Sequence, residues 1–377
     1  MKKSDISSLV VYAIMLVVLF CTFFFGVRDT LGKTFEGFAN IGVALLTIVI
    51  SFIVSSLLLE IGHVLGAKAG KYDIIAFNFL YFMFYKVNGK RKFKFSGPDG
   101  LFSETKVAPR VNENGEVISK PKAMLWLGNL FVALFIIAAA IVYVRFQGNT
   151  GMPYLSPIAL MAAVSAGCVL FYNFLPLELD NKTDGAQLKI VSKAANLKAF
   201  NENLRIKACE LSGENPGDVQ VFDEITNYTA NINMVTTYKL LGEEKYDEAL
   251  KIINHILEKE DSISERIRIE MVAQKLYILL YTQQIEKAKK YYEDITPEDK
   301  RFISNANGLV YIRTYVLISG ILDPAESEVQ YATSKADKGY KRVEALRKPV
   351  EAMLYKNSVK RIKELHPNWE PVIKDEK

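Results

Sequence analysis

Three ionisable residues border apolar segments of the chain, where charged side chains are costly and are usually kept for function. Glu60 and His63 stand three residues apart at the end of one apolar run, and Asp184 follows another. Imidazole and carboxylate groups ligate metals and transfer protons, so these residues are candidates for a metal or acid–base site. A plainer interpretation is also open, in which Glu60 and His63 pair with each other or with Lys68 at a helix end.

Four apolar stretches are long enough to cross a bilayer, which needs about 20 residues. They cover residues 7–27, 39–66, 123–144 and 157–177. Buried core helices can imitate one such stretch, but not four in the first half of one chain. The sequence therefore predicts a mainly α, polytopic membrane protein with about four transmembrane helices.

The basic residues of the loops predict the orientation. Residues 68–121 carry ten Lys or Arg against five acidic residues, whereas the loops 28–38 and 145–156 have no such excess. Basic loops remain in the cytoplasm, so we expect a multi-pass protein of the cell membrane with cytoplasmic N- and C-termini. The second and fourth spans then run in the same direction. This topology places Glu60, His63 and Asp184 at the same level of the bilayer.

These residues resemble the motifs of the site-2 protease family of intramembrane zinc metalloproteases. That family carries H-E-x-x-H on one transmembrane helix and N-x-x-P followed by D-G on a later one. The resemblance implies that Glu60 is the catalytic base and that His63 and Asp184 bind zinc. The second motif is matched by Asn173, Pro176 and Gly185, and Gly128-Asn129 is a weaker match to a glycine–asparagine element of the family.

The chain departs from this pattern at Leu59, which stands where the family has its first zinc-binding histidine. Catalytic zinc sites use three protein ligands, and His63 with Asp184 alone holds zinc only weakly. Asp180 is a possible substitute ligand, although it can equally be an interfacial acid at the end of a span. Leu59 is either a natural loss or an inactivating substitution. Zinc is therefore expected as a cofactor only if the protein is active, and otherwise none.

Residues 72–121 follow the second span and contain a predicted membrane-associated β-hairpin. Asn88-Gly89 separates an aromatic-rich run, 74–87, from a run of alternating Lys and Phe, 90–95, and Asn-Gly is a strong hairpin signal. One interpretation is an interfacial anchor with its lysines toward anionic lipid. The resemblance implies another, in which the strands hold an extended substrate by edge pairing.

Composition predicts two domains, a transmembrane domain at 1–190 and a cytoplasmic α-helical domain at 191–377. In the second, the segment from Tyr246 to Ala249 recurs loosely from Ile285 to Ala288. This pattern resembles a degenerate tetratricopeptide repeat, although the usual period of that repeat is 34 residues. The domain is then either a docking module for a protein partner or a helical bundle that packs only on itself.

The sequence favours a site-2-protease-like integral membrane protein that is catalytically impaired and binds transmembrane or membrane-associated peptides or proteins. One alternative is an active intramembrane zinc metalloprotease with a rearranged ligand set, and another is a membrane-tethered helical scaffold. The net charge of +5 is mild. No run of Lys and Arg interleaved with aromatic residues lies on a soluble face, so we expect no nucleic acid partner.

Overall fold

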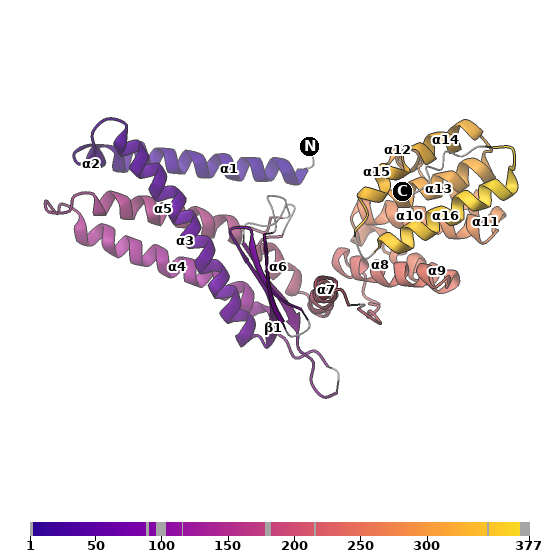
Figure 1. Ribbon diagram of the computed structural model, residues 1–377, viewed down its shortest axis with the longest axis horizontal. Helices are drawn as coiled ribbons and strands as arrows, with labels where there is room; N and C mark the ends of the chain where they lie inside the picture. The colour runs from indigo at the N-terminus through magenta and orange to yellow at the C-terminus, as the bar shows by residue number, and fades with distance from the viewer. Residues whose placement is uncertain are drawn as a thin grey trace. The chain divides into compact units, whose positions relative to one another are not determined.

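The computed structural model describes residues 3–87, 90–95, 103–114, 116–177, 182–214, 216–344 and 347–369. The protein is mainly helical, with one small antiparallel sheet (Figure 1). The chain divides into two compact units, Met1–Asn215 and Pro216–Lys377. We call them unit 1 and unit 2 and describe each by itself.

The helices of unit 1 are α1 (Lys3–Cys21), the π-helical turn η1 (Thr22–Val27), α2 (Arg28–Gly32), α3 (Ala39–Ala69), α4 (Pro121–Phe146), α5 (Leu155–Phe174), α6 (Asp184–Val191) and α7 (Ala194–Ser212). Four stretches are long and apolar enough to cross a membrane, namely Leu9–Gly32, α3, α4 and α5. They coincide with the four predicted spans. The fourth ends at Phe174 rather than at 177, because Pro176 disfavours helical backbone at the residue before it and Leu175 is extended.

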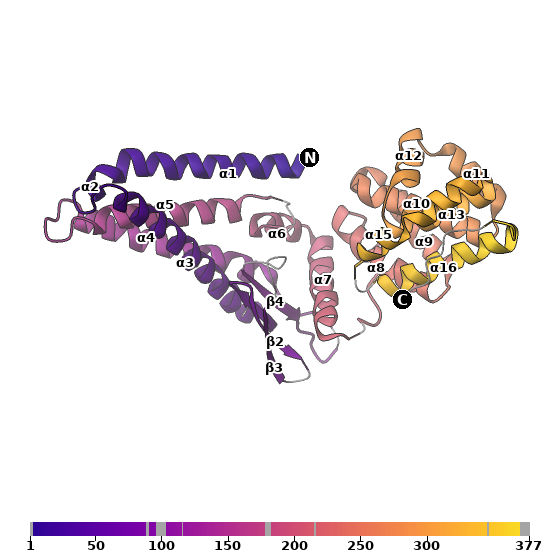
Figure 2. The same ribbon diagram turned by 45° about the horizontal axis from the view of Figure 1, so that its top comes forward.

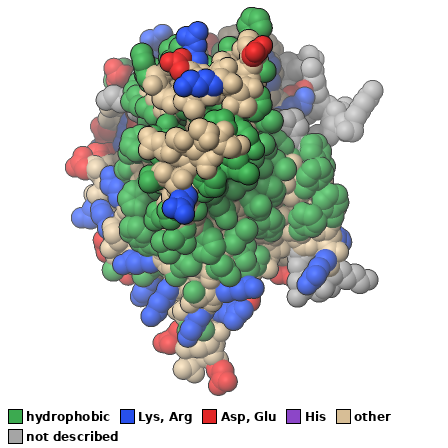
Figure 3. Space-filling model, turned by 90° about the vertical axis from the view of Figure 1, so that its left-hand side faces the viewer, with side chains coloured by type: hydrophobic (Ala, Val, Ile, Leu, Met, Phe, Trp, Pro, Cys, Tyr) green, Lys and Arg blue, Asp and Glu red, His purple; other side chains and the backbone are tan. Residues whose placement is uncertain are grey.

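The apolar helix α1 buries one narrow ridge and leaves its other faces open. Val11, Met15 and Leu19 recur at four-residue intervals and pack in one cluster with Met161 and Cys168 of α5. Most of the large apolar side chains elsewhere on α1 are exposed. Figure 3 shows hydrophobic side chains gathered over the face of unit 1 that is turned to the viewer.

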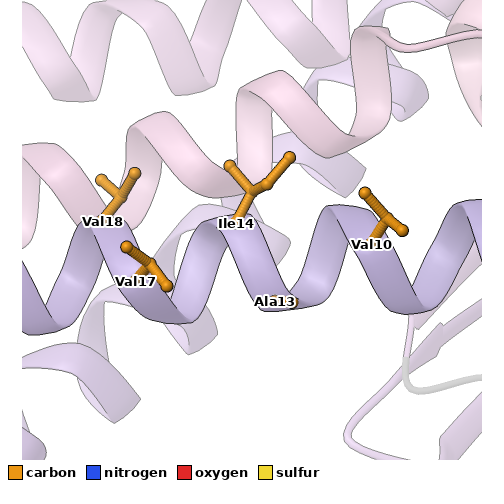
Figure 4. A pocket seen from close by; sticks show the side chains of 5 residues that line it. All are labelled: Val10, Ala13, Ile14, Val17 and Val18. Atoms are coloured by element: carbon orange, nitrogen blue, oxygen red, sulfur yellow. The ribbon is translucent and has the colours of Figure 1, made fainter.

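A shallow surface groove lies along α1 and is lined only by aliphatic side chains. Figure 4 shows these residues, which are Val10, Ala13, Ile14, Val17 and Val18. The exposed apolar side chains continue along α1 beyond this groove, and an extended apolar surface is unfavourable in water and marks contact with a membrane or another protein. The groove and the apolar faces around it therefore indicate association with a membrane.

Helices α3 and α4 approach each other closely because glycines form the contact between them. A Cβ atom on Gly62 of α3 would lie 2.5 Å from the Cα atom of Gly128 on α4. A Cβ atom on Gly66 would lie 2.5 Å from the carbonyl oxygen of Ala123. At the end of α3 the carbonyl of Gly70 accepts a hydrogen bond of 2.8 Å from the backbone N–H of Lys120. Small residues four apart are a usual means of close helix packing in membranes.

The sheet of unit 1 has four antiparallel strands in the order β3-β2-β1-β4. They are β1 (Tyr72–Phe79), β2 (Phe82–Val87), β3 (Lys90–Phe95) and β4 (Ser103–Pro109). Strands β2 and β3 pair on either side of residues 88–89, which lie outside the described residues. The run 74–87, expected to be one arm, is instead divided by a turn at Leu80 and Tyr81, whose φ angles are both positive. The sheet is therefore larger than the predicted hairpin.

One face of β2 and β3 carries a cluster of exposed phenylalanines. Register places Phe82 opposite Phe95 and Phe84 opposite Phe93. Their rings lie 5.1–5.6 Å apart between centroids across the strands, and each is 43–61% exposed. The alternation along β3 turns Lys92 and Lys94 to the opposite face. Residues 92–95 of β3 are thus aromatic on one face and basic on the other, and the basic side chains lie beside Met83 and Tyr85 of β2.

Helix α7 belongs to unit 1 although its sequence is less apolar than those of the membrane-length helices. The hydroxyl of Tyr72 on β1 donates to Asn201 Oδ1 of α7 at 2.5 Å. Asn201 Nδ2 donates in turn to the Ser119 carbonyl at 3.2 Å, and both the tyrosine and the asparagine are buried. The division between the units therefore falls after α7, further along the chain than the composition boundary at residue 190.

Unit 2 is entirely helical in its described residues. Its helices are α8 (Asn227–Gly242), α9 (Tyr246–Leu257), the short 3-10 turn η2 (Glu260–Ser262), α10 (Glu265–Tyr281), α11 (Ile285–Asp294), α12 (Pro297–Asn305), α13 (Leu309–Leu317), the π-helical turn η3 (Ile318–Leu322), α14 (Glu326–Ser334), α15 (Ala336–Lys341) and α16 (Lys348–Leu365). A single large apolar cluster joins α8 to α16.

The pairs α8–α9 and α10–α11 are joined by turns of the same geometry. Glu244 has a φ of 57° and Gln283, at the same place in the second pair, has a φ of 62°. The residue after each donates its backbone N–H to the same relative carbonyl, at 2.9 Å in the first turn and 2.8 Å in the second. Ala249 and Ala288 are both fully buried. The loose sequence similarity thus corresponds to two helix pairs with a common turn.

The close contact of α3 with α4 leads to a prediction with a control on the same helix. Gly66→Ala places a methyl group against the α4 backbone, and we expect it to lower the free energy of unfolding by about 1–3 kcal/mol, as overpacking does. Gly42→Ala, where nothing lies within 4 Å of the added Cβ, is expected to be neutral or to stabilise by about 0.5–1 kcal/mol. Chemical unfolding of the detergent-solubilised protein measures both. Equal effects at the two positions would contradict the packing argument.

Candidate functional site

The three sequence-predicted ionisable residues meet in unit 1. Glu60 and His63 lie on α3, one turn apart, and Asp184 is the first residue of α6. Glu60 and Asp184 are 3% and 4% exposed, so two carboxylates are nearly removed from solvent. Ionisable groups buried to this extent need hydrogen-bonding partners.

The imidazole ring of His63 lies between the two carboxylates. His63 Nε2 is 2.9 Å from Asp184 Oδ2, and Nδ1 is 3.4 Å from Glu60 Oε2. The two ring nitrogens face different partners, so the carboxylates lie on opposite sides of the ring. An ionised carboxylate only accepts hydrogen bonds, so the ring donates to Asp184 through Nε2 and can donate to Glu60 through Nδ1.

Two asparagine amides complete the surroundings of Asp184. Asn129 Nδ2 of α4 donates to Asp184 Oδ2 at 3.0 Å, and Asn173 Nδ2 of α5 donates to the same oxygen at 2.6 Å. With His63, one carboxylate oxygen thus accepts from three nitrogen atoms that belong to three different helices. Asp184 is therefore the point at which α3, α4, α5 and α6 are joined by polar contacts.

The orientation of both amides is determined by backbone groups. The N–H of Asp184 donates to Asn173 Oδ1 at 3.3 Å, which leaves Nδ2 of Asn173 to face the carboxylate. Asn173 Nδ2 also donates to Asn129 Oδ1 at 3.1 Å, and Asn129 Nδ2 donates to the Leu125 carbonyl at 2.9 Å. Rotating either amide by half a turn would set oxygen against oxygen. Both asparagines therefore present N–H groups to Asp184.

Glu60 is held by the sheet. The Thr105 hydroxyl on β4 donates to Glu60 Oε2 at 2.6 Å, a short distance typical of a bond to a charged acceptor. Sequence reasoning missed Thr105, and no local signal identifies it, because its role depends on how the sheet packs beside α3. Glu60 thus connects the membrane-length helix to strand β4.

Two glycines allow the backbones at the site to approach. A Cβ atom on Gly128 would lie 2.7 Å from His63 Nε2, so the absence of that atom makes room for the ring. A Cβ atom on Gly185 would lie 2.0 Å from the Phe174 carbonyl oxygen, so α6 begins directly against the end of α5. Thr183 caps α6 by accepting from the Ala186 N–H. This tight start of α6 places Asp184 beside His63.

The side chains of the remaining predicted residues either make no contact with Asp184 that the structure records or lie outside the described residues. Leu59 is on α3 and its carbonyl would lie 2.9 Å from a Cβ on Gly128, but its side chain has no donor atom for a metal. Pro176 is exposed in the segment after α5. Asp180 lies outside the described residues, so the structure does not place the proposed substitute ligand.

The described side chains do not fit a catalytic zinc ion. Such an ion needs three protein ligands at about 2.0–2.2 Å, and His63 Nε2 and Asp184 Oδ2 supply only two. Glu60 faces the other ring nitrogen and cannot complete the same set. Among the described residues, no group of three or more His, Cys, Asp or Glu side chains is arranged to hold a metal. No reaction step through zinc follows from this arrangement.

No protein-family model, no curated protein and no solved structure matches the chain. The functional conclusion therefore rests on the arrangement of these residues and on the sequence motifs that led to them.

Because Asn173 donates to Asp184, we expect substitutions at these two positions to be energetically coupled. Asn173→Leu removes one donor to Asp184 Oδ2 and leaves that carboxylate under-satisfied, which costs about 1–3 kcal/mol. In Asp184→Asn the buried charge is absent, so Asn173→Leu is expected to cost less there. A double-mutant cycle by chemical unfolding should give a coupling energy of about 1 kcal/mol or more. The control combines Asn173→Leu with Glu36→Gln at an exposed position, and the two effects should add. A coupling energy for this control pair as large as that of Asn173 with Asp184 would refute the contact.

Proposed function

We propose that the chain is a site-2-protease-like integral membrane protein that binds membrane polypeptides and does not cleave them through a zinc centre. In this proposal α1 with α2, α3, α4 and α5 cross the bilayer. Both termini lie in the cytoplasm, as the excess of basic residues in 68–121 favours. The long apolar helices and their exposed apolar faces support the membrane placement.

The observation that carries the proposal is the set of donors around Asp184. Three N–H groups already serve its Oδ2 atom, and Leu59 stands where a third protein ligand is needed. The carboxylate is thereby stabilised by hydrogen bonds. A base at Glu60 then has no metal-bound water to activate, which favours a non-catalytic protein.

The meeting of the two sequence motifs supports the family resemblance. Glu60 and His63 from the first motif lie beside Asn173, Asp184 and Gly185 from the second, although more than a hundred residues separate the two motifs. If Glu60 and His63 were only interfacial charges at a helix end, nothing would require them to meet Asp184. The contact between the motifs supports the proposed resemblance, in which leucine stands at one ligand position.

The sheet beside the site supports a role in binding polypeptides. Strand β3 is an edge of the sheet, and its residues 91–95 are all exposed. An exposed edge can pair with an extended segment, whose side chains then contact the neighbouring face. Phe93 and Phe95 offer that segment aromatic contacts close to the membrane. We propose that β3 receives an extended part of a membrane polypeptide.

Zinc content is the first test. We expect the purified protein to contain no stoichiometric zinc by mass spectrometry, because its ligand set is incomplete. Leu59→His supplies a second histidine one turn before His63, on the same face of α3, and this variant is expected to gain close to one zinc per chain. Adding His63→Ala to it should remove that zinc again.

The opposite result has a clear meaning. Stoichiometric zinc in the unaltered protein, lost on His63→Ala, would show that another ligand completes the site. Cleavage of a reconstituted transmembrane peptide that disappears in Glu60→Gln would likewise refute the non-catalytic proposal and establish an active protease.

Edge pairing on β3 is tested by crosslinking in proteoliposomes. A photoreactive residue replacing Phe95 is expected to crosslink a synthetic transmembrane peptide that has an extended flank. Proline at alternate positions of the flank removes the N–H groups needed for pairing, and it should abolish the crosslink. The same photoreactive residue at Met83, which is buried, is the control. Lipid adducts alone at Phe95 would favour an interfacial anchor instead.

A further inference from the structure

Helix α16 covers one side of a layer of helices in unit 2, and we call this side the inner surface of the layer. Helices α8, α10 and α13 form one layer, with α9, α11 and α14 packed against one side of it. Helix α16 packs against α13 and α8 on the other side, as Figures 1 and 2 show for α13. The layer is thus a surface whose cover is the last helix of the described chain.

The contact between this layer and α16 has a buried ion pair at its centre. Arg313 of α13 is fully buried and donates to Glu351 of α16 at 3.0 Å through Nε and at 3.3 Å through Nη2. Its Nη2 also donates to Gln274 Oε1 of α10 at 2.5 Å. The guanidinium lies over the ring of Tyr277, 4.1 Å from the centroid.

A second charged contact joins α16 to the same layer. Arg347, which precedes α16, donates to Glu270 of α10 at 3.2 Å. Glu270 also accepts from the Tyr238 hydroxyl of α8 at 2.9 Å, and Arg347 lies over the Tyr238 ring. Burial raises the pKa of the Glu270 carboxyl, so its desolvation outweighs the attraction of Arg347. The layer thus presents an acidic and a basic residue to α16.

Helix α16 leaves part of this polar surface without partners. The buried atoms Arg313 Nη1 and Gln274 Nε2 have no hydrogen-bond partner among the described residues. Buried donors are nearly always paired in folded proteins. Two neighbouring unpaired donors therefore indicate a surface that α16 fits only in part, and that has room for an additional acceptor.

Charged residues are an unusual choice for a permanent helix–helix contact. A buried ion pair adds little stability compared with apolar residues of the same volume, and apolar residues could have joined α16 to the layer. Charges do define the register and the identity of a partner. The layer therefore has the character of a recognition surface, although Leu354 and Ile362 of α16 also pack against it.

We propose that the inner surface of α8, α10 and α13 is a docking site for a helix of a partner protein and that α16 is its resident, displaceable occupant. The partner is an amphipathic helix that carries a basic residue and, four residues later, an acidic one, as Arg347 and Glu351 do. A further carboxylate or amide oxygen on the partner pairs with Arg313 Nη1 and Gln274 Nε2. This proposal concerns unit 2 and does not depend on the function of the site in unit 1.

The full chain in detergent tests the proposal, with a labelled synthetic peptide of residues 347–366 as the probe. Glu351→Gln weakens the hold of α16 on Arg313, so the peptide is expected to bind this variant at least about tenfold more tightly than the unaltered protein. Glu364→Gln is the matched control, because Glu364 lies on the same helix with its side chain 52% exposed. The control should bind the peptide as the unaltered protein does.

Hydrogen exchange of the unaltered protein tests the proposal even if the Glu351→Gln variant fails to fold. Amides of α16 are expected to exchange through a local opening, at least about tenfold faster than those of α10 and α13. Exchange of all three helices at one common rate would show that α16 is a permanent part of the core and would overturn the proposal. Local opening without peptide binding to a folded Glu351→Gln variant would overturn it as well.

Discussion

The close approach of α3 to α4 is the constraint on which the geometry of unit 1 depends. Helices usually pack with their axes about 8–10 Å apart, and side chains at the contact set that distance. At Gly62, Gly66 and Gly128 no side chain is present, and added Cβ atoms would lie within 2.7 Å of the opposing helix. The ring of His63 uses this space, and Asn129 on α4 thereby comes within reach of the same carboxylate.

Both units bury charged groups, and both satisfy them with amides as well as with counter-charges. In unit 1 the Asp184 carboxylate accepts from His63 and from two asparagines, and in unit 2 Arg313 pairs with Glu351 and Gln274. Amide groups add hydrogen bonds without adding net charge, so they lower the cost of desolvation. The two sites differ in whether every buried polar atom has a hydrogen-bond partner. Asp184 Oδ2 has three donors, whereas one nitrogen of Arg313 has no partner among the described residues.

The long apolar helices and the meeting of Glu60, His63 and Asp184 could be predicted because both follow from length, hydropathy and the direction of the spans. The strand pairing around residues 88–89 could be predicted from the Asn-Gly signal. The turn at Leu80 and Tyr81 could not, because neither residue favours positive φ and the surrounding sheet imposes it. The membership of α7 in unit 1 depends on single long-range contacts such as Tyr72 with Asn201. The spacing of Gly62, Gly66 and Gly70 did contain the signal for the α3–α4 contact.

A site that is held together by hydrogen bonds can lose a metal ligand without losing its shape. Leu59 is an apolar side chain within the apolar helix α3, so the fold accommodates it at this position. Asp184 keeps its position because Asn129, Asn173 and the N-terminus of α6 hold it. Glu60 keeps its position through Thr105. On the proposed function, the residues of the two motifs therefore keep their positions without a third zinc ligand, since the asparagines, Thr105 and the start of α6 hold them by hydrogen bonds.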